Sequence, residues 1–347
     1  MEKMKSFITT ILACLPIAMQ AQSSELTCWT VKGEQFQLSI KGSIAEIPDS
    51  VAAVDLRGLG GMTLDRSAAN PNCLYYTDDD TDVEGLPNAN VVSGGVCDGL
   101  LLTDQACFYC PIAFRATDAM LRFTPRRDDG GDATDFSQPC HETLFLPFDA
   151  DMVIPSDVNG PMPDEWLQVA CYYEYNYIYK CLLFSQADAA YLSAHMPYLV
   201  RFAYGAYGTQ ILFCGENTMV RQTQTINVGG GNFYFSGVTT LQQEAPSYFR
   251  YYRGRDQYFI HTNDGKPMEP FRCFIAYGNP TEPDYAQPGY SGQILEYSIE
   301  DAIESTRIKT VSHHRSPDVY YDLSGRRVSA ENTRKGIYIA NGRKIIR

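Results

Sequence analysis

The sequence predicts an all-β protein, with a β-sandwich body followed by short C-terminal β-hairpins. Tyrosine and phenylalanine are frequent, with 24 and 17 residues, and aromatic residues favour strands. Short apolar runs recur at short intervals between clusters of Gly, Asn and Asp, and this spacing is typical of sandwiches and barrels. Only residues 187–195 and 299–307 are typical of a helix, and both stretches are brief.

Length and composition are those of a globular chain. Its 347 residues suffice for one large or two ordinary domains. A hydrophobic content of 44% excludes the disordered and membrane-embedded classes. We expect five regions along the chain. They are a signal peptide (1–22), an N-terminal β region (23–95), the β-sandwich body (96–292), a linker (293–315) and a C-terminal β tail (316–347).

The first region has the features of a secretory signal peptide. Two lysines precede an apolar stretch at residues 7–19, and a cleavage point fits at residues 21–22. The alternative is a lipid anchor on Cys14, since residues 11–14 are similar to a lipobox. The chain continues apolar after Cys14, where a polar tether is expected, and this favours ordinary cleavage. No other stretch is long and apolar enough to cross a membrane.

The N-terminal β region alternates apolar and polar residues. Residues 44–51 and 54–56 look like one turn of a leucine-rich repeat. A solenoid needs several stacked repeats, and the sequence shows one. We therefore predict two ordinary strands joined by a Pro-Asp turn. After a glycine-rich break, a strand is expected over residues 70–76 and a loop over residues 78–82.

The body contains many short apolar segments that we predict as strands. Their ranges are 90–92, 99–102, 119–123, 142–148, 167–184, 198–203, 209–214, 232–235, 258–260 and 271–277. Clusters of Gly, Asn and Asp separate them, as turns require. Residues 278–292 are rich in Pro, Gly and Tyr, and we expect them to form the exit loop.

Several segments of the body also resemble a known kind of domain. These segments are residues 100–111, 143–149, 197–202, 231–235 and 270–272. Together they look like the β-rich domain near the ends of secreted bacterial surface proteins, which often carry leucine-rich repeats. The resemblance implies secretion and surface display, and it implies no reaction. Because no repeat array is visible, an adhesive solenoid is not expected.

The tail is predicted to form two hairpins. The first turns at Gly325, and the second turns at Asn341 and Gly342. Asn-Gly suits a type I′ turn, because that turn needs positive φ at both central positions. A lone hairpin is barely stable in water, so the tail must dock on another surface or pair with itself.

These hairpins resemble the C-terminal sorting signal of the type IX secretion route of Gram-negative bacteria. The residues that carry the resemblance are Tyr321, Gly325, Gly336, Tyr338, Gly342 and Lys344. The resemblance implies that the secretion machinery binds the tail. It also implies that the protein is secreted or held at the outer cell surface.

Charge differs between the tail and the rest of the chain. The formal net charge is −13, yet residues 307–347 carry ten basic and three acidic residues. The remaining chain is therefore strongly acidic, which argues against nucleic acid and anionic membranes as partners. A basic tail on an acidic body fits a tail that separate machinery binds, or one that lies on the body.

Ten cysteines remain after the signal peptide, and an even number in an exported chain indicates disulfides. Cys171 and Cys181 lie symmetrically about Asn176. A hairpin centred there would place them opposite each other, so we predict a disulfide between them. Cys107 and Cys110 form a CxxC motif, but a redox site needs a helix after the motif, and none is expected.

No residue is predicted to act as a catalyst or to bind a cofactor or metal. Asp78, Asp80 and Asp82 alternate like calcium ligands, but the Gly and Glu that an EF-hand loop requires are missing. A solvated loop is the preferred interpretation, and a looser calcium site is the alternative. Residues 289–293 lack the final glycine of a nucleophile elbow.

Clustered tyrosines are the feature that indicates a ligand. Residues 172–179 hold five tyrosines, and Tyr248, Tyr251 and Tyr252 lie in a second cluster with three arginines. We take these last three as candidate ligand-binding residues, because exposed aromatic rings bind sugars and Tyr with Arg is typical of interfaces. The alternative is that the tyrosines fill a sandwich core.

These observations favour a secreted, surface-displayed, non-catalytic protein with a structural, adhesive or ligand-binding role. The alternative is a carbohydrate-binding or carbohydrate-active module that uses its tyrosine-rich faces. The expected partners are the secretion machinery, through the tail, and a glycan or host surface ligand. No enzyme activity, cofactor or transmembrane segment is expected.

Overall fold

The chain is all-β throughout the residues that the computed structural model describes. These residues are 25–125, 140–155, 167–178, 180–202, 210–224, 227–230, 232–240, 248–252, 258–261, 268–277, 294–300, 320–321, 327–328, 337–340 and 343–346. They contain no helix, which confirms the predicted class. The chain divides into two compact units, Met1–Ile299 and Glu300–Arg347.

The helix predicted at residues 187–195 is wrong. Residues 188–196 form a loop, in which Leu192 makes an isolated bridge to Ala150 through two hydrogen bonds of 2.8 Å. The alanines in this stretch favour a helix, but Leu192 makes its backbone hydrogen bonds with the distant Ala150 instead of with neighbouring residues. Of the second predicted helix, residues 299–300 end a strand, and residues 301–307 lie outside the described residues.

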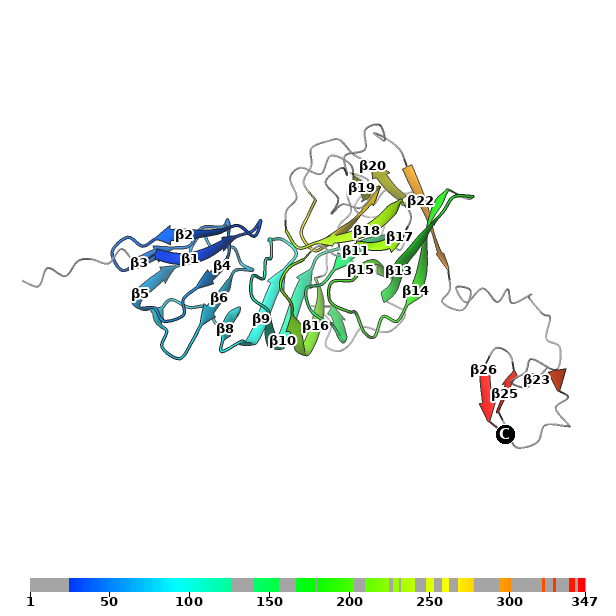
Figure 1. Ribbon diagram of the computed structural model, residues 1–347, viewed down its shortest axis with the longest axis horizontal. Coiled ribbons are helices and arrows are strands. Elements are labelled where there is room, and N and C mark those ends of the chain that lie inside the picture. The colour runs from blue at the N-terminus through cyan, green and yellow to red at the C-terminus, as the bar shows by residue number, and fades with distance from the viewer. Residues whose placement is uncertain are drawn as a thin grey trace, which may run out of the picture. The chain divides into compact units, whose positions relative to one another are not determined.

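The N-terminal part of the first unit is a short solenoid. Its strands are β1 (Glu25–Thr30), β2 (Gln35–Ser39), β3 (Ile44–Glu46), β4 (Val51–Asp55), β5 (Gly60–Asp65), β6 (Leu74–Thr77), β7 (Asp82–Glu84) and β8 (Val91–Ser93). The chain alternates between two sheets (Figure 1). Strands β4, β6 and β8 pair in parallel in one sheet, and β3, β5 and β7 pair in parallel in the other.

This solenoid corrects the prediction that no repeat array is present. The two expected strands and their turn at Pro48 do form, as β3 and β4, but two further turns of the solenoid follow them. The sequence pattern concealed these turns because their buried residues are varied. They include Met62, Leu64, Cys73 and Tyr75, so no leucine repeat marks them.

An antiparallel hairpin precedes the parallel strands in the same sheet. Strand β1 pairs with β4, and β2 pairs with β1 over all five of its residues. Leu26 and Cys28 alternate along β1 and are fully buried with Val54 in the solenoid core. This period of two places the apolar side chains of β1 between the two sheets.

Two buried asparagines join the solenoid to β9 (Val96–Thr103). The Asn90 side chain accepts a hydrogen bond from the Leu101 amide at 2.7 Å and donates to the Leu101 carbonyl at 3.0 Å. Asn72 does the same with Thr103, at 2.8 Å in each direction. The two asparagine side chains thus provide hydrogen-bond partners for backbone amides and carbonyls of β9.

The first unit continues as two large sheets. The nine-stranded sheet has the order β12-β16-β10-β9-β8-β6-β4-β1-β2, and the ten-stranded sheet has the order β11-β15-β13-β14-β22-β20-β19-β21-β18-β17. The additional strands are β10 (Phe114–Phe123), β11 (Cys140–Phe145), β12 (Met152–Pro155), β13 (Leu167–Asn176), β14 (Cys181–Ala187), β15 (Pro197–Phe202), β16 (Ile211–Val220), β17 (Asn227–Gly230), β18 (Phe233–Val238), β19 (Tyr248–Tyr252), β20 (Tyr258–His261), β21 (Arg272–Tyr277) and β22 (Ile294–Glu300). Residues expected to begin the linker therefore form β22, which pairs with β20.

Strands β11, β13 and β15 are buried on both faces. Leu144 and Val200 belong to one core with the nine-stranded sheet, whereas Phe145 and Leu199 belong to a second core with β18 and β21. Neighbouring residues of a strand point to opposite faces, so a strand between two cores is apolar at consecutive positions. This explains the unbroken apolar run at residues 144–146.

One buried charge connects these layers. Arg272 on β21 is 2% exposed and donates hydrogen bonds to Asp104 Oδ2 at 3.0 Å and to the Thr124 carbonyl at 3.1 Å. Its guanidinium also lies 3.9 Å from the centre of the Phe123 ring and 3.8 Å from the Glu142 carboxylate. A buried cation requires such partners, because burial without them is costly.

The second unit contains a small antiparallel sheet. Its strands are β23 (Tyr320–Tyr321), β24 (Arg327–Val328), β25 (Ile337–Ala340) and β26 (Arg343–Ile346), in the order β24-β23-β25-β26. Both predicted hairpins are present, and they pair with each other through β23 and β25. Tyr321, Tyr338 and Lys344 lie in these strands, while Gly325, Gly336 and Gly342 lie outside the described residues.

Candidate functional site

The β13–β14 hairpin shows that the predicted Cys171–Cys181 disulfide is wrong. Cys171 lies opposite Ser185, and Cys181 lies opposite Asn176, because the strands end at Asn176 and Cys181 and the register shifts after Tyr172. The two cysteines are therefore not cross-strand partners. No disulfide is present among the cysteines whose side chains are described.

The tyrosines of this hairpin divide between the core and the surface. Tyr172 is buried, with its hydroxyl 3.4 Å from the Phe233 carbonyl and its ring against Phe184. Tyr175 is half-buried, and its ring centre lies 4.3 Å from that of Phe233. For these two residues, the alternative of core packing is confirmed. Tyr177 is 61% exposed.

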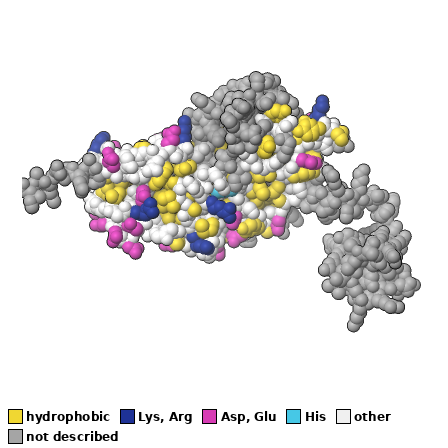
Figure 2. Space-filling view, viewed as in Figure 1, with side chains coloured by type: hydrophobic (Ala, Val, Ile, Leu, Met, Phe, Trp, Pro, Cys, Tyr) yellow, Lys and Arg dark blue, Asp and Glu magenta, His cyan; other side chains and the backbone are white. Residues whose placement is uncertain are grey.

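We define the hairpin tip as residues 175–180, of which Tyr179 is not described. Ile178, at its apex, is 85% exposed. The Ile178 amide donates to Asn176 Oδ1 at 2.9 Å, and Lys180 has a φ of 54°, so an Asx turn and a left-handed residue shape the turn. Figure 2 shows hydrophobic side chains, with a basic one beside them, over the projecting hairpin.

The rings of Tyr175 and Tyr177 form a right-angled corner. Their centres are 5.0 Å apart and their planes meet at 86°. Burial raises the pKa of Tyr175, and Cys181 and Tyr177 raise it further, so its hydroxyl is neutral at physiological pH. The tip therefore offers two aromatic surfaces beside an exposed isoleucine. Such surfaces stack on sugar rings or enter apolar pockets of a partner.

The three candidate ligand-binding tyrosines lie on β19, between β20 and β21 in the ten-stranded sheet. Tyr251 is the register partner of Phe259, Tyr252 that of Tyr258, and Tyr248 that of Ala276. The structure describes only the backbone of β19. Their role in ligand binding stays a prediction.

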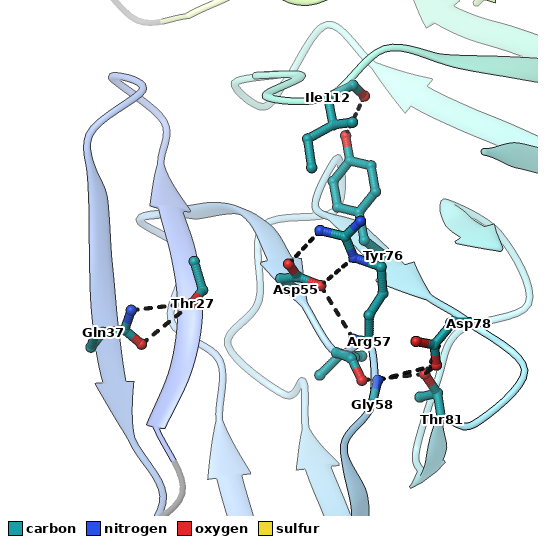
Figure 3. A network of polar contacts seen from close by, with 10 residues as sticks. Thr27, Gln37, Asp55, Arg57, Gly58, Tyr76, Asp78, Thr81 and Ile112 are labelled. Atoms are coloured by element: carbon teal, nitrogen blue, oxygen red, sulfur yellow. Dashed lines mark hydrogen bonds and ion pairs between the residues drawn. The ribbon is translucent and has the colours of Figure 1, made fainter. Parts of the chain in front are cut away.

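A network of polar contacts lies on the solenoid (Figure 3). Arg57 holds Asp55 through two hydrogen bonds, of 2.8 and 2.7 Å, and this contact lowers the pKa of the Asp55 carboxyl. Thr27 and Gln37 pair across β1 and β2, with the Gln37 amide donating at 3.1 Å. These pairs are exposed to solvent and hold fixed positions on the sheet surface.

Asp78, the first aspartate of the predicted acidic loop, belongs to the same network. Its Oδ1 accepts hydrogen bonds from the Thr81 hydroxyl at 2.7 Å and from the Gly58 amide at 3.1 Å, and both bonds lower its pKa. The carboxylate therefore closes the loop after β6. Among the described residues, no group of three or more His, Cys, Asp and Glu side chains could hold a metal ion.

The second cysteine of the CxxC motif does not have the setting of a reactive thiol. The Cys110 side chain is buried, donates to the Ile112 carbonyl at 3.3 Å and lies 3.8 Å from the Tyr76 hydroxyl. Burial raises its pKa to about 12. Because the thiolate is the nucleophile, this thiol stays protonated and unreactive at physiological pH.

The structure brings together a serine, a histidine and an aspartate that sequence reasoning did not single out. His195 is 5% exposed, has a φ of 59°, and stacks on Phe145 with ring centres 5.8 Å apart. The Asp149 carboxylate accepts from the Ala194 amide at 2.7 Å, and the Ser193 amide donates to the Tyr198 hydroxyl at 2.8 Å. A catalytic triad needs these side chains to bond to one another, whereas the bonds to Tyr198 and to Asp149 are donated by backbone amides.

His195 is held neutral by its surroundings. Burial lowers the pKa of the imidazole, Arg221 lowers it further, and Asp149 opposes the change. No partner for Nδ1 is found in the described part of the chain. The residue lies in the loop before β15, and no periodic pattern in the sequence could have indicated its burial.

Comparison with known proteins identifies no relative: no family model, curated protein or solved structure matches the chain. Across the described ranges, no helix has the length and apolar character that crossing a membrane requires.

Proposed function

We propose that this protein is exported to the outer surface of a Gram-negative cell and binds a ligand there without catalysing a reaction. The signal peptide and the sorting-like tail in the sequence support export. The hairpin tip carries the proposal of binding, because Tyr177 and Ile178 expose 61% and 85% of their surface at one point. Tyrosines that a partner buries contribute much of the binding energy in known interfaces.

In this proposal, the body is a β-sandwich that supports the tip. The two halves of the ten-stranded sheet contribute Phe184, Phe235 and Phe259 to one core, so the sheet folds over onto itself. Tyr175 packs on Phe233 within the same arrangement. The tip is thereby attached to a packed core, and a pre-organised contact surface loses less entropy on binding.

A carbohydrate ligand is the second candidate, and the right-angled Tyr175–Tyr177 pair favours it. One ring can stack on a sugar face while the other contacts its edge. Glu174 and Lys180 are exposed beside the pair and supply an acceptor and a donor for hydroxyl groups. Tyr248, Tyr251 and Tyr252 remain candidates for further sugar contacts.

Binding is tested with the purified protein on a glycan array and on host cell surfaces. Tyr177→Ala is expected to reduce binding at least tenfold, whereas Tyr191→Ala, at another tyrosine that is 52% exposed, leaves it unchanged. Binding to glycans supports the carbohydrate candidate, and binding only to cells supports a protein ligand. Equal binding by both variants would contradict a role for the tip.

Export is tested separately with a chain that ends at Ser316. Loss of surface display with retained synthesis is expected, because the tail is the proposed ligand of the secretion machinery. Substitution of Lys344 in the full chain is the finer test. Normal display of the shortened chain would refute the sorting role of the tail.

A further inference from the structure

Strand β2 is an unprotected edge of the nine-stranded sheet. It pairs with β1 without irregularity, and within the described part of the chain it has no neighbour on its other side. Natural edge strands are usually protected by charges, proline or bulges. The opposite edge strand of this sheet, β12, ends in Pro155, but β2 contains no charged residue or proline.

The solenoid core is also open beside this edge. Phe36, Leu38 and Ile40 alternate along the chain and are only half-buried against that core. Ile44 begins β3, the edge strand of the neighbouring sheet, and is 50% exposed. Solenoid ends normally carry a polar cap that protects the core. Here β2 and β3 are the edge strands of their sheets, and the apolar side chains on and beside them are only partly covered.

We propose that this edge pairs antiparallel with the β2 strand of a second copy of the chain. The strand reads Gln-Phe-Gln-Leu-Ser, so its polarity is symmetrical about Gln37. A two-fold axis at Gln37 sets Phe36 opposite Leu38 of the second copy, and Gln35 opposite Ser39 of the second copy. A two-fold interface requires this self-complementarity.

Charge at the two ends of the strand fits the antiparallel direction. Glu34 precedes β2 and Lys41 follows it, and both are exposed. In the antiparallel pair, Glu34 lies opposite Ile40 of the second copy, so the acidic end of each strand lies near the basic end of the other. Attraction between opposite charges favours this direction. Pairing in the opposite direction would place like charges together.

Gln37 lies at the centre of the proposed interface and provides the test. Its side chain is on the solvent face, where it donates to Thr27 Oγ1 at 3.1 Å (Figure 3). Gln37→Lys and Gln37→Glu each place two like charges across the two-fold axis. Gln186→Lys is the matched control, since Gln186 is an exposed glutamine on β14.

Sedimentation equilibrium of the purified protein measures the outcome, with circular dichroism to verify folding. The native chain is expected to form a dimer, and each Gln37 variant is expected to raise the dissociation constant at least tenfold. An equal mixture of the Lys and Glu variants restores dimers, and the Gln186 control leaves them unchanged. A native chain that stays monomeric up to roughly 1 mM, or a Gln37→Lys dimer as tight as the native one, overturns the proposal.

A cysteine at the axis verifies the register. Directly opposed residues in antiparallel strands have Cα separations of about 4.5–5.5 Å, within the range of a disulfide. Gln37→Cys is therefore expected to form a covalent dimer under mild oxidation. Gln35→Cys should not, because it faces Ser39 of the second copy. Equal cross-linking of both variants would exclude this register.

Discussion

The solenoid and the layered body stabilise their buried polar groups in different ways. In the solenoid, Asn72 and Asn90 hold backbone amides and carbonyls of nearby turns. In the body, the charged Arg272 joins residues that are 130 or more positions away, such as Glu142 and Asp104. Local neutral bonds suffice where each turn packs on the next. In the body, strands that are distant in sequence pack together, and the buried Arg272 is neutralised only when the tertiary structure brings Asp104 and Glu142 beside it.

The largest effect is expected at this buried charge. Arg272→Met removes the cation between two carboxylates that are fully buried, Asp104 and Glu142. A buried ion pair that loses one partner costs about 3–5 kcal/mol. The free energy of unfolding, measured by guanidinium titration, gives the loss. Adding Asp104→Asn should recover part of it, and a loss below about 1 kcal/mol would show that the network contributes little.

A smaller but clear effect is expected in the solenoid. Asn90→Ala removes the bonds to Leu101 and forces alanine to a φ of 64°. Two unsatisfied backbone groups and this strain together cost about 2–4 kcal/mol. Asn90→Gly keeps the conformation and separates the two contributions. Faster hydrogen exchange of the Leu101 amide is the local measure, and unchanged exchange would contradict the assignment.

Acid is expected to weaken the body through His195. Its folded pKa lies below the ordinary value of 6.5, so the unfolded chain binds the proton more readily. The resulting stability is complete above pH 6.5 and is lost as pH falls toward the folded pKa. Thermal unfolding from pH 8 to pH 5 measures this loss. His195→Asn tolerates the left-handed backbone and cannot titrate, so its curve should be flatter; parallel curves would exclude His195 as the cause.

The smallest effect is expected at the exposed pair of the solenoid. Arg57→Met breaks the Asp55 contact, but the arginine side chain is 47% exposed. Exposed pairs contribute about 0.2–1 kcal/mol and weaken as salt increases. Urea titrations at low and high salt should show a small difference that disappears at high salt. A loss as large as that of Arg272→Met would remove the contrast between the two regions.

The fold class and most strands could be predicted from the sequence, because alternation and apolar runs are local properties of a few consecutive residues. Alternation identified β1, and unbroken apolar runs identified β11 and β15. It failed at the solenoid, where Met62 and Tyr75 occupy positions that a leucine repeat would fill. It also failed at residues 187–195, where the bridge from Ala150 to Leu192 replaces a helix.

The candidate site shows the same limit. The tyrosine-rich hairpin was visible in the sequence, yet its register was not, so Cys171 and Cys181 were paired wrongly. Which tyrosines are exposed also depended on distant strands, since Phe233 on β18 covers part of Tyr175. Phe233 is far from the hairpin in the sequence, so the residues of the hairpin do not indicate that it covers Tyr175.

By itself, the sequence determined the all-β class, the tyrosine-rich hairpin and the two hairpins of the tail, because period and turn chemistry act over a few residues. Only the tertiary structure decided that the N-terminal strands stack as a solenoid, that β11 and β15 lie between two cores, and that Tyr177 and Ile178 are exposed while Tyr172 is not. The physical reason is that burial and register depend on which distant strands come together.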